Sequence, residues 1–234
     1  MIDSVYETEK LYLPGAPILA GLTFRLFRAE SDYAAIASVS NVYNRAMHIE
    51  EIHTAEMLEN SFSHTLEFDP RRDVLLAELD GQVIGHSRTW FRPLDDGTLI
   101  YVVHGCLLPD WTRRGIGRAM RHYSEQHVRR LAADRLKTAP SFFQSFAVES
   151  ETGKRALLQS DGYAPVRHFC LMVRPNLDDI PDLPLPAGLE VKPIEPQHYR
   201  SIFLALNEAF RDHWGHSEQT SEDDYQRFIN DPQL

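Results

Sequence analysis

One stretch decides how the fold is read: Leu107-Leu108-Pro109-Asp110-Trp111-Thr112-Arg113-Arg114-Gly115-Ile116-Gly117-Arg118-Ala119-Met120. It ends an apolar run typical of a strand, and after Pro109 the apolar residues recur every three or four positions, as on one face of a helix. Backbone N–H groups at a helix start lack partners within the helix, and the helix dipole is positive there. The stretch therefore predicts an anion site. A pyrophosphate fits it, because Gly115 and Gly117 leave room for its approach.

The charge of the chain sets the sign of the partners that we expect. Its 234 residues carry a formal net charge of −10, so phosphates would be repelled and general nucleic-acid binding is not expected. A cationic substrate fits that sign, although acidic solubility explains it equally well. Against this background Arg113, Arg114 and Arg118 place positive charge beside the two glycines. The alternative interpretation is that these arginines are ordinary solvated side chains.

Other phosphate-binding and metal-binding motifs fit the chain less well. A dinucleotide fingerprint needs a third small residue where Met120 stands, and a parallel strand–helix–strand unit at the start of the fold. A Walker loop needs Gly-Lys-Ser/Thr, which the sequence lacks. Cys106 and Cys170 do not have metal-ligand spacing, so we expect two small buried residues and no metal.

The flanking sequence predicts a mixed α/β fold. Asp80-Gly81 and Asp96-Gly97 each separate two strand-like runs and therefore indicate hairpins of an antiparallel meander. Ser31 or Asp32 could cap a first helix, and Thr54 could cap a second. The expected strands are 22–29, 73–79, 82–92, 98–107, 142–148 and 166–174, and the expected helices are about 31–43, 54–62, 116–131 and 152–160.

The last quarter of the chain resembles its beginning. Residues 176–187 are rich in proline and aspartate and read as a linker. At a constant offset of 166, the residues after it repeat those near the start: Tyr33 and Tyr199, Ile36 and Ile202, Asn41 and Asn207, Arg45 and Arg211, Thr54 and Thr220, Glu56 and Glu222, Phe62 and Phe228. Chance likeness between amphipathic helices is the alternative. We interpret 188–234 as the first strand and two helices of an incomplete second copy, which should dock on residues 1–175 or on another chain.

The deciding stretch, placed after two hairpins and before an amphipathic helix, resembles the coenzyme A signature of the GNAT acetyltransferases. The resemblance covers about residues 22–174 and implies a GNAT acyltransferase domain over 1–175. The run Asn207-Glu208-Ala209-Phe210-Arg211-Asp212-His213-Trp214-Gly215 opens the second copy, and this arrangement is similar to tandem members of the family such as mycothiol synthase.

The resemblance implies that acetyl-coenzyme A is the cosubstrate. The backbones of Cys106, Leu107 and Leu108 would lie along its pantetheine arm. The backbone N–H groups of one run would hold the pyrophosphate: Arg113, Arg114, Gly115, Ile116, Gly117 and Arg118. The family pattern is Gln/Arg-x-x-Gly-x-Gly/Ala, and its first position falls on Thr112, which costs little if the backbone makes the contacts. Many members also have a tyrosine that protonates the leaving thiolate, and here that position is Leu158.

The implied activity is direct transfer of an acetyl group to the primary amine of an unidentified small-molecule or peptide acceptor. The amine must lose a proton, so a base or a water path is needed. His104 is the first candidate, because it precedes Leu107 by three residues on the strand that should border the acetyl group. Glu78 on the neighbouring hairpin is the second. The alternatives are a histidine packed in the sheet and a surface glutamate. The rival function is a catalytically degenerate module that binds acyl-coenzyme A and supports a second catalytic copy or a partner.

The sequence also bears on location. It has no apolar run of roughly 18 residues, so no membrane span is expected. Residues 1–20 carry acids and prolines and lack the charged-then-apolar pattern of a signal peptide, which favours a cytoplasmic protein. The sequence leaves a homodimer open.

Overall fold

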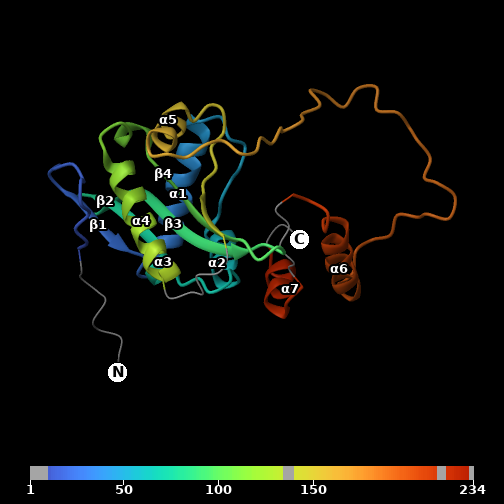
Figure 1. Cartoon of the computed structure of the whole chain (residues 1–234). Coiled ribbons are helices and arrows are strands. Elements are labelled where there is room, and N and C mark those ends of the chain that lie inside the picture. Colours follow the sequence, from blue (N-terminus) through green and yellow to red (C-terminus); the bar gives the residue numbers. More distant parts are fainter. Residues whose placement is uncertain (1–9, 134–139, 215–219, 232–234) are drawn as a thin grey trace.

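The computed structural model describes residues 10–133, 140–214 and 220–231 (Figure 1). The regular elements, in chain order, are β1 (Leu22–Leu26), α1 (Ser31–Ala46), α2 (Ala55–Ser63), α3 (Pro70–Asp73), β2 (Val74–Leu79), β3 (Gln82–Pro93), β4 (Leu99–Leu107), α4 (Ile116–Ala133), β5 (Ser141–Gln144), α5 (Thr152–Ser160), α6 (Tyr199–Ala209) and α7 (Glu222–Ile229). Single 3-10 turns lie at Pro109–Trp111 and Pro196–His198. In the described ranges, no helix is long and apolar enough to cross a membrane.

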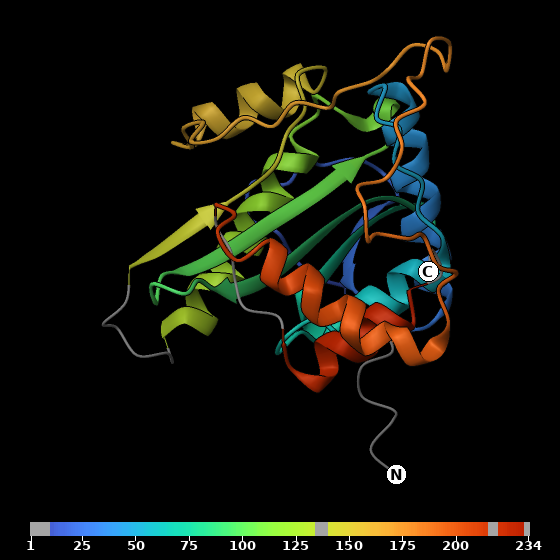
Figure 2. The ribbon, with the colours of Figure 1, turned by 90° about the vertical axis from the view of Figure 1, so that its right-hand side faces the viewer.

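The strands form one mixed sheet in the order β1-β2-β3-β4-β5. The first four strands are antiparallel neighbours, whereas β5 runs parallel to β4. Figure 2 shows α4 on one side of this sheet and α1 on the other. The mixed α/β class that the sequence predicts is therefore confirmed.

Alternation along β2 explains how the sheet holds both helix layers. Leu75 and Ala77 pack with α4 in one apolar cluster, while Val74 and Leu76 pack with α1 and α2 in another. All four side chains are at most 2% exposed. A strand covered on both faces reads as a continuous apolar run, which is what Val74-Leu75-Leu76-Ala77 is.

Both expected hairpin turns are confirmed, and so is one of the two expected helix caps. Asp80 and Gly81 both have positive φ, 50° and 82°, as a tight hairpin requires. The hairpin at Asp96-Gly97 also forms, with Gly97 at φ 84°. Thr54 caps α2, because its hydroxyl accepts a hydrogen bond from the Met57 N–H at 3.2 Å.

The expected cap of the first helix is wrong. The residue before α1 is Glu30, and its side chain makes no capping bond. Asp32 lies inside the helix, where its carboxylate accepts from the Arg28 N–H at 2.8 Å and from the Arg25 guanidinium. The ion pair with Arg25 therefore takes the carboxylate that sequence reasoning assigned to a cap.

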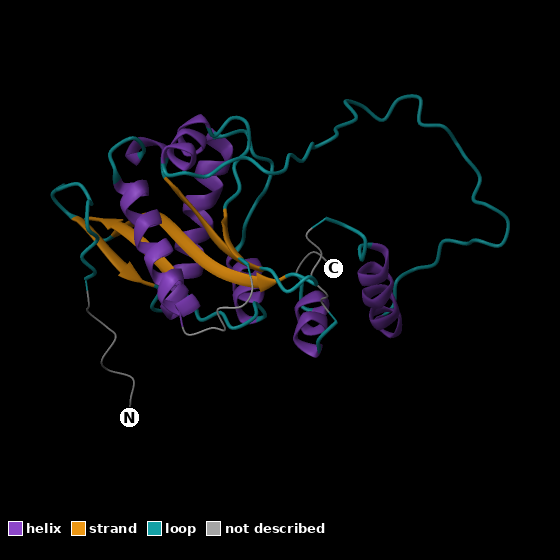
Figure 3. Ribbon diagram, in the orientation of Figure 1, coloured by secondary structure: helices purple, strands orange, loops and turns teal. Residues whose placement is uncertain are grey.

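Two expected strands do not form, at 166–174 and at the start of the proposed second copy. The chain has neither helix nor strand from 163 to 195. This segment is the long loop that Figure 3 draws in teal. Val166 and Leu171 are 78% and 81% exposed. A β-like pattern needs a neighbouring edge, and β5 offers only four residues, ending at Gln144 rather than near Val148 as expected. The expected linker is thus part of a longer loop.

Helices α6 and α7 form a small unit that docks on the first domain. Phe203 of α6 packs against Tyr225 and Phe228 of α7, with ring centroids 5.4 and 5.6 Å apart. The Asn60 side-chain amide on α2 donates to the Arg227 carbonyl at 3.2 Å, and the Arg227 guanidinium donates to the His64 carbonyl at 3.1 Å. These contacts confirm the expected docking. The two helices lie where the offset from α1 and α2 predicts, to within about three residues.

Candidate functional site

The end of β4 leaves one backbone edge open. β5 pairs with β4 only from Leu99 to Val102, whereas β4 continues to Leu107 in register with β3. From Val103 onward the edge of β4 that faces away from β3 has no strand partner among the described residues. The Leu108 N–H donates to the Ile84 carbonyl at 2.8 Å and holds this end against the hairpin. An extended ligand could therefore use the open edge.

A row of free N–H groups follows directly. None of the six backbone N–H groups of residues 113–118 has a hydrogen-bond acceptor among the described residues. The first bond of the new helix is from the Ala119 N–H to the Gly115 carbonyl, at 3.1 Å. Arg113 and Gly115 have φ of 61° and 88°, which turns successive N–H groups toward one side. We call residues 113–118 the N–H nest; it is the arrangement that binds phosphate groups at helix N-termini.

The side chains around the N–H nest play different parts. Ile116 is fully buried, so only its backbone is available. Arg113, Arg114 and Arg118 are all exposed. Arg114 lies over the Trp111 ring at 4.7 Å, and Arg118 donates to the Ser160 hydroxyl at 2.9 Å. Arg113 and Arg114 thus add positive charge at the rim of the nest, whereas the charge of Arg118 is partly offset by the Asp161 carboxylate, 3.8 Å from its Nε.

The candidate base His104 lies on the α1 side of the sheet, one residue after Val103, where the open edge of β4 begins. Directly opposite it on β3 is Arg88, and the next pair on that face is Cys106 with His86. The His86 ring nitrogen Nε2 is 2.9 Å from the Ser40 hydroxyl and 3.3 Å from the Cys106 sulfur. The His104 Nδ1 is buried and has no hydrogen-bond partner in the described part of the chain. Of the ring nitrogens in this cluster, the His104 Nδ1 is the one that is fully buried without a hydrogen-bond partner among the described residues.

Burial controls the protonation of this cluster. It lowers the pKa of His86 to about 3 and the pKa of His104 well below 6.5, in both cases helped by nearby cationic groups. Burial also raises the pKa of the Cys106 thiol to about 12. At neutral pH both imidazoles are therefore neutral and the thiol keeps its proton. His104 is in the form that can accept a proton, although its lowered pKa makes it a weak base.

A carboxylate that sequence reasoning missed fixes the segment after β5. Glu151 is 4% exposed, and its oxygens accept from the Tyr43 hydroxyl at 2.6 Å, the Val148 N–H at 2.6 Å and the Lys154 ammonium at 3.1 Å. Tyr43 and Glu151 are 108 residues apart, so no local pattern joins them. This network ties α1 to the start of α5 beside the open edge of β4.

The structure separates Glu78 from His104. His104 stands opposite Arg88, which stands opposite Val74, and Glu78 lies four residues further along β2. The Glu78 carboxylate instead accepts from the Arg25 Nε at 2.7 Å, within a buried group that includes Asp32. Glu78 thus has a partner elsewhere.

Leu158 lies on α5, where the resemblance implies a tyrosine. Its carbonyl accepts from the Tyr163 N–H at 3.0 Å as the helix ends. The Tyr163 hydroxyl donates to Glu125 of α4 at 2.9 Å. The nearest tyrosine along the chain is thus bound to α4.

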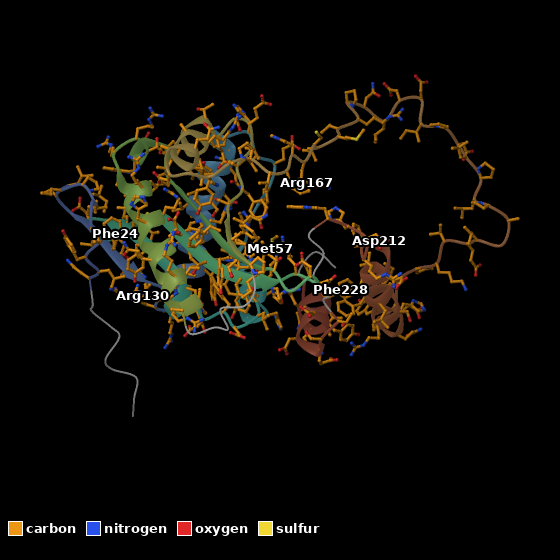
Figure 4. All side chains as sticks on the ribbon, viewed as in Figure 1. Phe24, Met57, Arg130, Arg167, Asp212 and Phe228 are labelled. Carbon is orange, nitrogen blue, oxygen red and sulfur yellow. The ribbon has the colours of Figure 1, made fainter. Side chains whose placement is uncertain are left out.

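A cavity of about 750 Å³ opens on the α2 side of β3. Arg88 and Arg92 of β3 and apolar side chains of α2, α6 and α7 line it, together with polar residues that include the carboxylates Glu51, Asp224 and Asp231. Figure 4 labels two of the lining residues, Met57 from α2 and Phe228 from α7. Asn41 holds the segment before α2 in place, since its amide exchanges hydrogen bonds with the His53 backbone at 2.8 and 2.9 Å. The cavity lies on the same face of the sheet as His104.

The family follows from the comparisons with known proteins. The model described as "Acetyltransferase (GNAT) family" matches residues 32–147, and the chain therefore contains a GNAT acetyltransferase domain. The matched stretch begins in α1, extends past β5 and includes the N–H nest. None of the curated proteins compared matches the chain.

One solved structure shows a similar fold. A GCN5-related N-acetyltransferase from Sphaerobacter thermophilus has a TM-score of 0.59 at 21% identity, over 81% of this chain. This chain spans 58% of the length of that protein. Weaker matches include the aminoglycoside N-acetyltransferase AAC(6')-Iy in complex with CoA, with a TM-score of 0.47 at 13% identity, over 69% of this chain and 99% of that one. A ribosomal-protein-alanine N-acetyltransferase from Brucella melitensis biovar Abortus 2308 has a TM-score of 0.42 at 17% identity, over 65% of this chain and 98% of that one.

Proposed function

We propose that this chain is an acyl-coenzyme A-dependent N-acetyltransferase that moves an acetyl group from acetyl-coenzyme A to a primary amine. The single observation that carries the proposal is the N–H nest, with six unpartnered N–H groups at the start of α4, directly after the open edge of β4. The residues fit the cosubstrate, because the nest suits its pyrophosphate and the open edge of Cys106, Leu107 and Leu108 suits its pantetheine arm.

In direct transfer the amine nitrogen attacks the thioester carbonyl carbon. The C–N bond forms, the C–S bond breaks, the amine gives up a proton, and the thiolate takes one from water, since Leu158 has none to donate. We assign the amine's proton to the unpartnered Nδ1 of His104. Glu78 is not part of this assignment, because its carboxylate is held by Arg25.

Release of free thiol from acetyl-coenzyme A, measured against a panel of amines, tests the proposal. We expect thiol release that depends on the amine and one acetylated product per thiol. Coenzyme A binding without release above the hydrolysis background, for every amine, would instead support the rival function. Leu158 favours that rival, a module that binds acyl-coenzyme A without turnover, because leucine cannot protonate the thiolate.

We further propose that residues 188–234 open a second GNAT copy, as in tandem members similar to mycothiol synthase, and that the protein is cytoplasmic. Support comes from the helix pair α6 and α7, which follows the spacing of α1 and α2. The intact mass of the native protein tests the tandem arrangement. A mass near 26.9 kDa would leave no room for the rest of a second copy.

A further inference from the structure

The Arg88 guanidinium has no carboxylate partner among the described residues. Its guanidinium lies over three aromatic rings, 4.3 Å from the centroid of Trp90, 4.8 Å from that of Phe62 and 5.5 Å from that of Phe68. Its one hydrogen bond in the described structure is a long one, 3.5 Å from Nη1 to the Ser61 hydroxyl. The Nε is buried and has no acceptor, and no described carboxylate forms an ion pair with Arg88.

Such an arrangement is costly unless something else binds the guanidinium. Burial lowers the pKa of Arg88 to about 10, which still leaves it charged at neutral pH. Ring faces attract a cation, but they accept none of its in-plane N–H groups. A buried charge with unsatisfied donors is therefore expected to meet an anionic acceptor.

The position of Arg88 relates it to the acetyl-transfer site. It lines the 750 Å³ cavity together with Arg92, and it stands directly opposite His104 in the sheet. Side chains that are directly opposite in an antiparallel pair have Cβ atoms about 4.5–5.5 Å apart. The guanidinium extends from there over the rings of Phe62 and Phe68, so a molecule with its amine at His104 would reach it with the part that extends into the cavity.

We propose that the acceptor amine carries an anionic oxygen group, a carboxylate or a phosphate, and that Arg88 binds this group. The proposal rests on the proposed function and adds the substrate class. The acceptor also has an apolar part, because Met57, Phe203, Phe210 and Phe228 line the cavity. The carboxylates of Glu51, Asp224 and Asp231 line it too, so Arg88 must bind the anionic group against acidic side chains of the same wall.

Matched pairs of amines test this without any variant. Phenylalanine is phenethylamine with a carboxylate, lysine is cadaverine with a carboxylate, and phosphoethanolamine is ethanolamine with a phosphate. We expect at least one anionic member to exceed its partner by about tenfold or more in kcat/KM, since charge-assisted hydrogen bonds are the strong ones. The carboxylate and phosphate pairs tell the two anions apart. Phenylalanine methyl ester should behave like phenethylamine if carboxylate is the group bound.

Variants then assign the effect to Arg88. Arg88→Met and Arg88→Gln should reduce the preference, measured as the ratio of the two kcat/KM values within a pair, to about twofold or less. Arg88→Lys should keep part of it, because the charge remains. Arg71→Met is the matched control, since Arg71 is exposed on α3, away from the cavity. No preference in any pair, or a preference that survives in Arg88→Met or Arg88→Gln, overturns the proposal.

A failure of the proposed function is distinguishable from a failure of this inference. If the proposed function fails, no amine releases thiol. The same pairs of amines are then compared by calorimetric titration of the protein with coenzyme A present. Tighter binding of an anionic member, lost in Arg88→Met, supports Arg88 as an anion-binding residue. Equal binding of both members, or equal binding by both proteins, overturns it.

Discussion

Gly117, in the first turn of α4, stands against Leu107, the last residue of β4: a Cβ added to the glycine would lie 3.3 Å from the leucine Cδ1. The strand end and the helix start therefore meet without a side chain between them. This contact fixes where the N–H nest sits relative to the open edge of β4. A ligand that uses both would pass over this point.

Replacing Gly117 should weaken coenzyme A binding in proportion to the size of the new side chain. We expect Gly117→Ala to have a small effect, because the flexible end of Leu107 can move. Gly117→Val should lower affinity by about tenfold or more, because a β-branched side chain blocks approach to the backbone N–H groups. Calorimetric titration with coenzyme A measures this, with thermal melting as the check on folding. Unchanged affinity in folded Gly117→Val would contradict the assignment of the nest.

His104 should set the acid limb of the pH–rate profile, and that limb should lie below pH 6.5. Burial and nearby cations lower the pKa of His104, so its neutral form persists into mildly acidic solution. His104→Ala should lower turnover by about a hundredfold or more, with little change in coenzyme A affinity. An acid limb that survives in His104→Ala, at the same pH, would exclude His104 as the base.

His86 should make the folded state sensitive to acid. Burial, then the charges of Arg88, His53 and Lys154, lowers the pKa of His86 from 6.5 to about 3. The unfolded chain therefore binds a proton below pH 6.5 that the folded chain does not, so stability falls as pH falls from 6.5 toward 3. At about pH 5 the loss is on the order of 2 kcal/mol.

Denaturant unfolding of His86→Gln across this range measures that contribution. The variant should flatten the decline in the free energy of unfolding between about pH 7 and pH 5. His168→Gln is the matched control, because His168 is exposed in the loop 163–195. Parallel pH profiles for the wild type and His86→Gln would show that His86 does not cause the decline.

Glu78 should matter for stability rather than for turnover. Its carboxylate accepts from Arg25, whose side chain is only 8% exposed and which also pairs with Asp32. Glu78→Gln weakens a charge-assisted hydrogen bond beside a buried cation, so we expect a loss of about 1–3 kcal/mol in the free energy of unfolding. The kcat should stay within about twofold. A large fall in kcat at unchanged stability would restore Glu78 as a base.

Local features of this protein could be predicted from sequence because their causes are local. The Asp80-Gly81 hairpin follows from backbone preferences within one turn, and α5 begins and ends at the predicted residues, Thr152 and Ser160. The N–H nest is equally local, since strand end, loop and helix start are consecutive.

Features that depend on distant partners could not be predicted. The run 166–174 looks like a strand, but no edge receives it. Glu151 has no role until the fold brings Tyr43 to it, and Arg88 is an ordinary strand residue until Phe62 and Phe68 enclose it. In each case the deciding neighbour is far away in sequence.

The backbone amide NMR spectrum of the chain, recorded with increasing coenzyme A, shows whether the N–H nest and the open edge of β4 bind the cosubstrate. We expect saturable shifts concentrated in residues 113–118 and in 103–108 of β4, with the amides of 163–195 unmoved. A titration that leaves the resonances of 113–118 unchanged up to the highest coenzyme A concentration would contradict the assignment of the N–H nest.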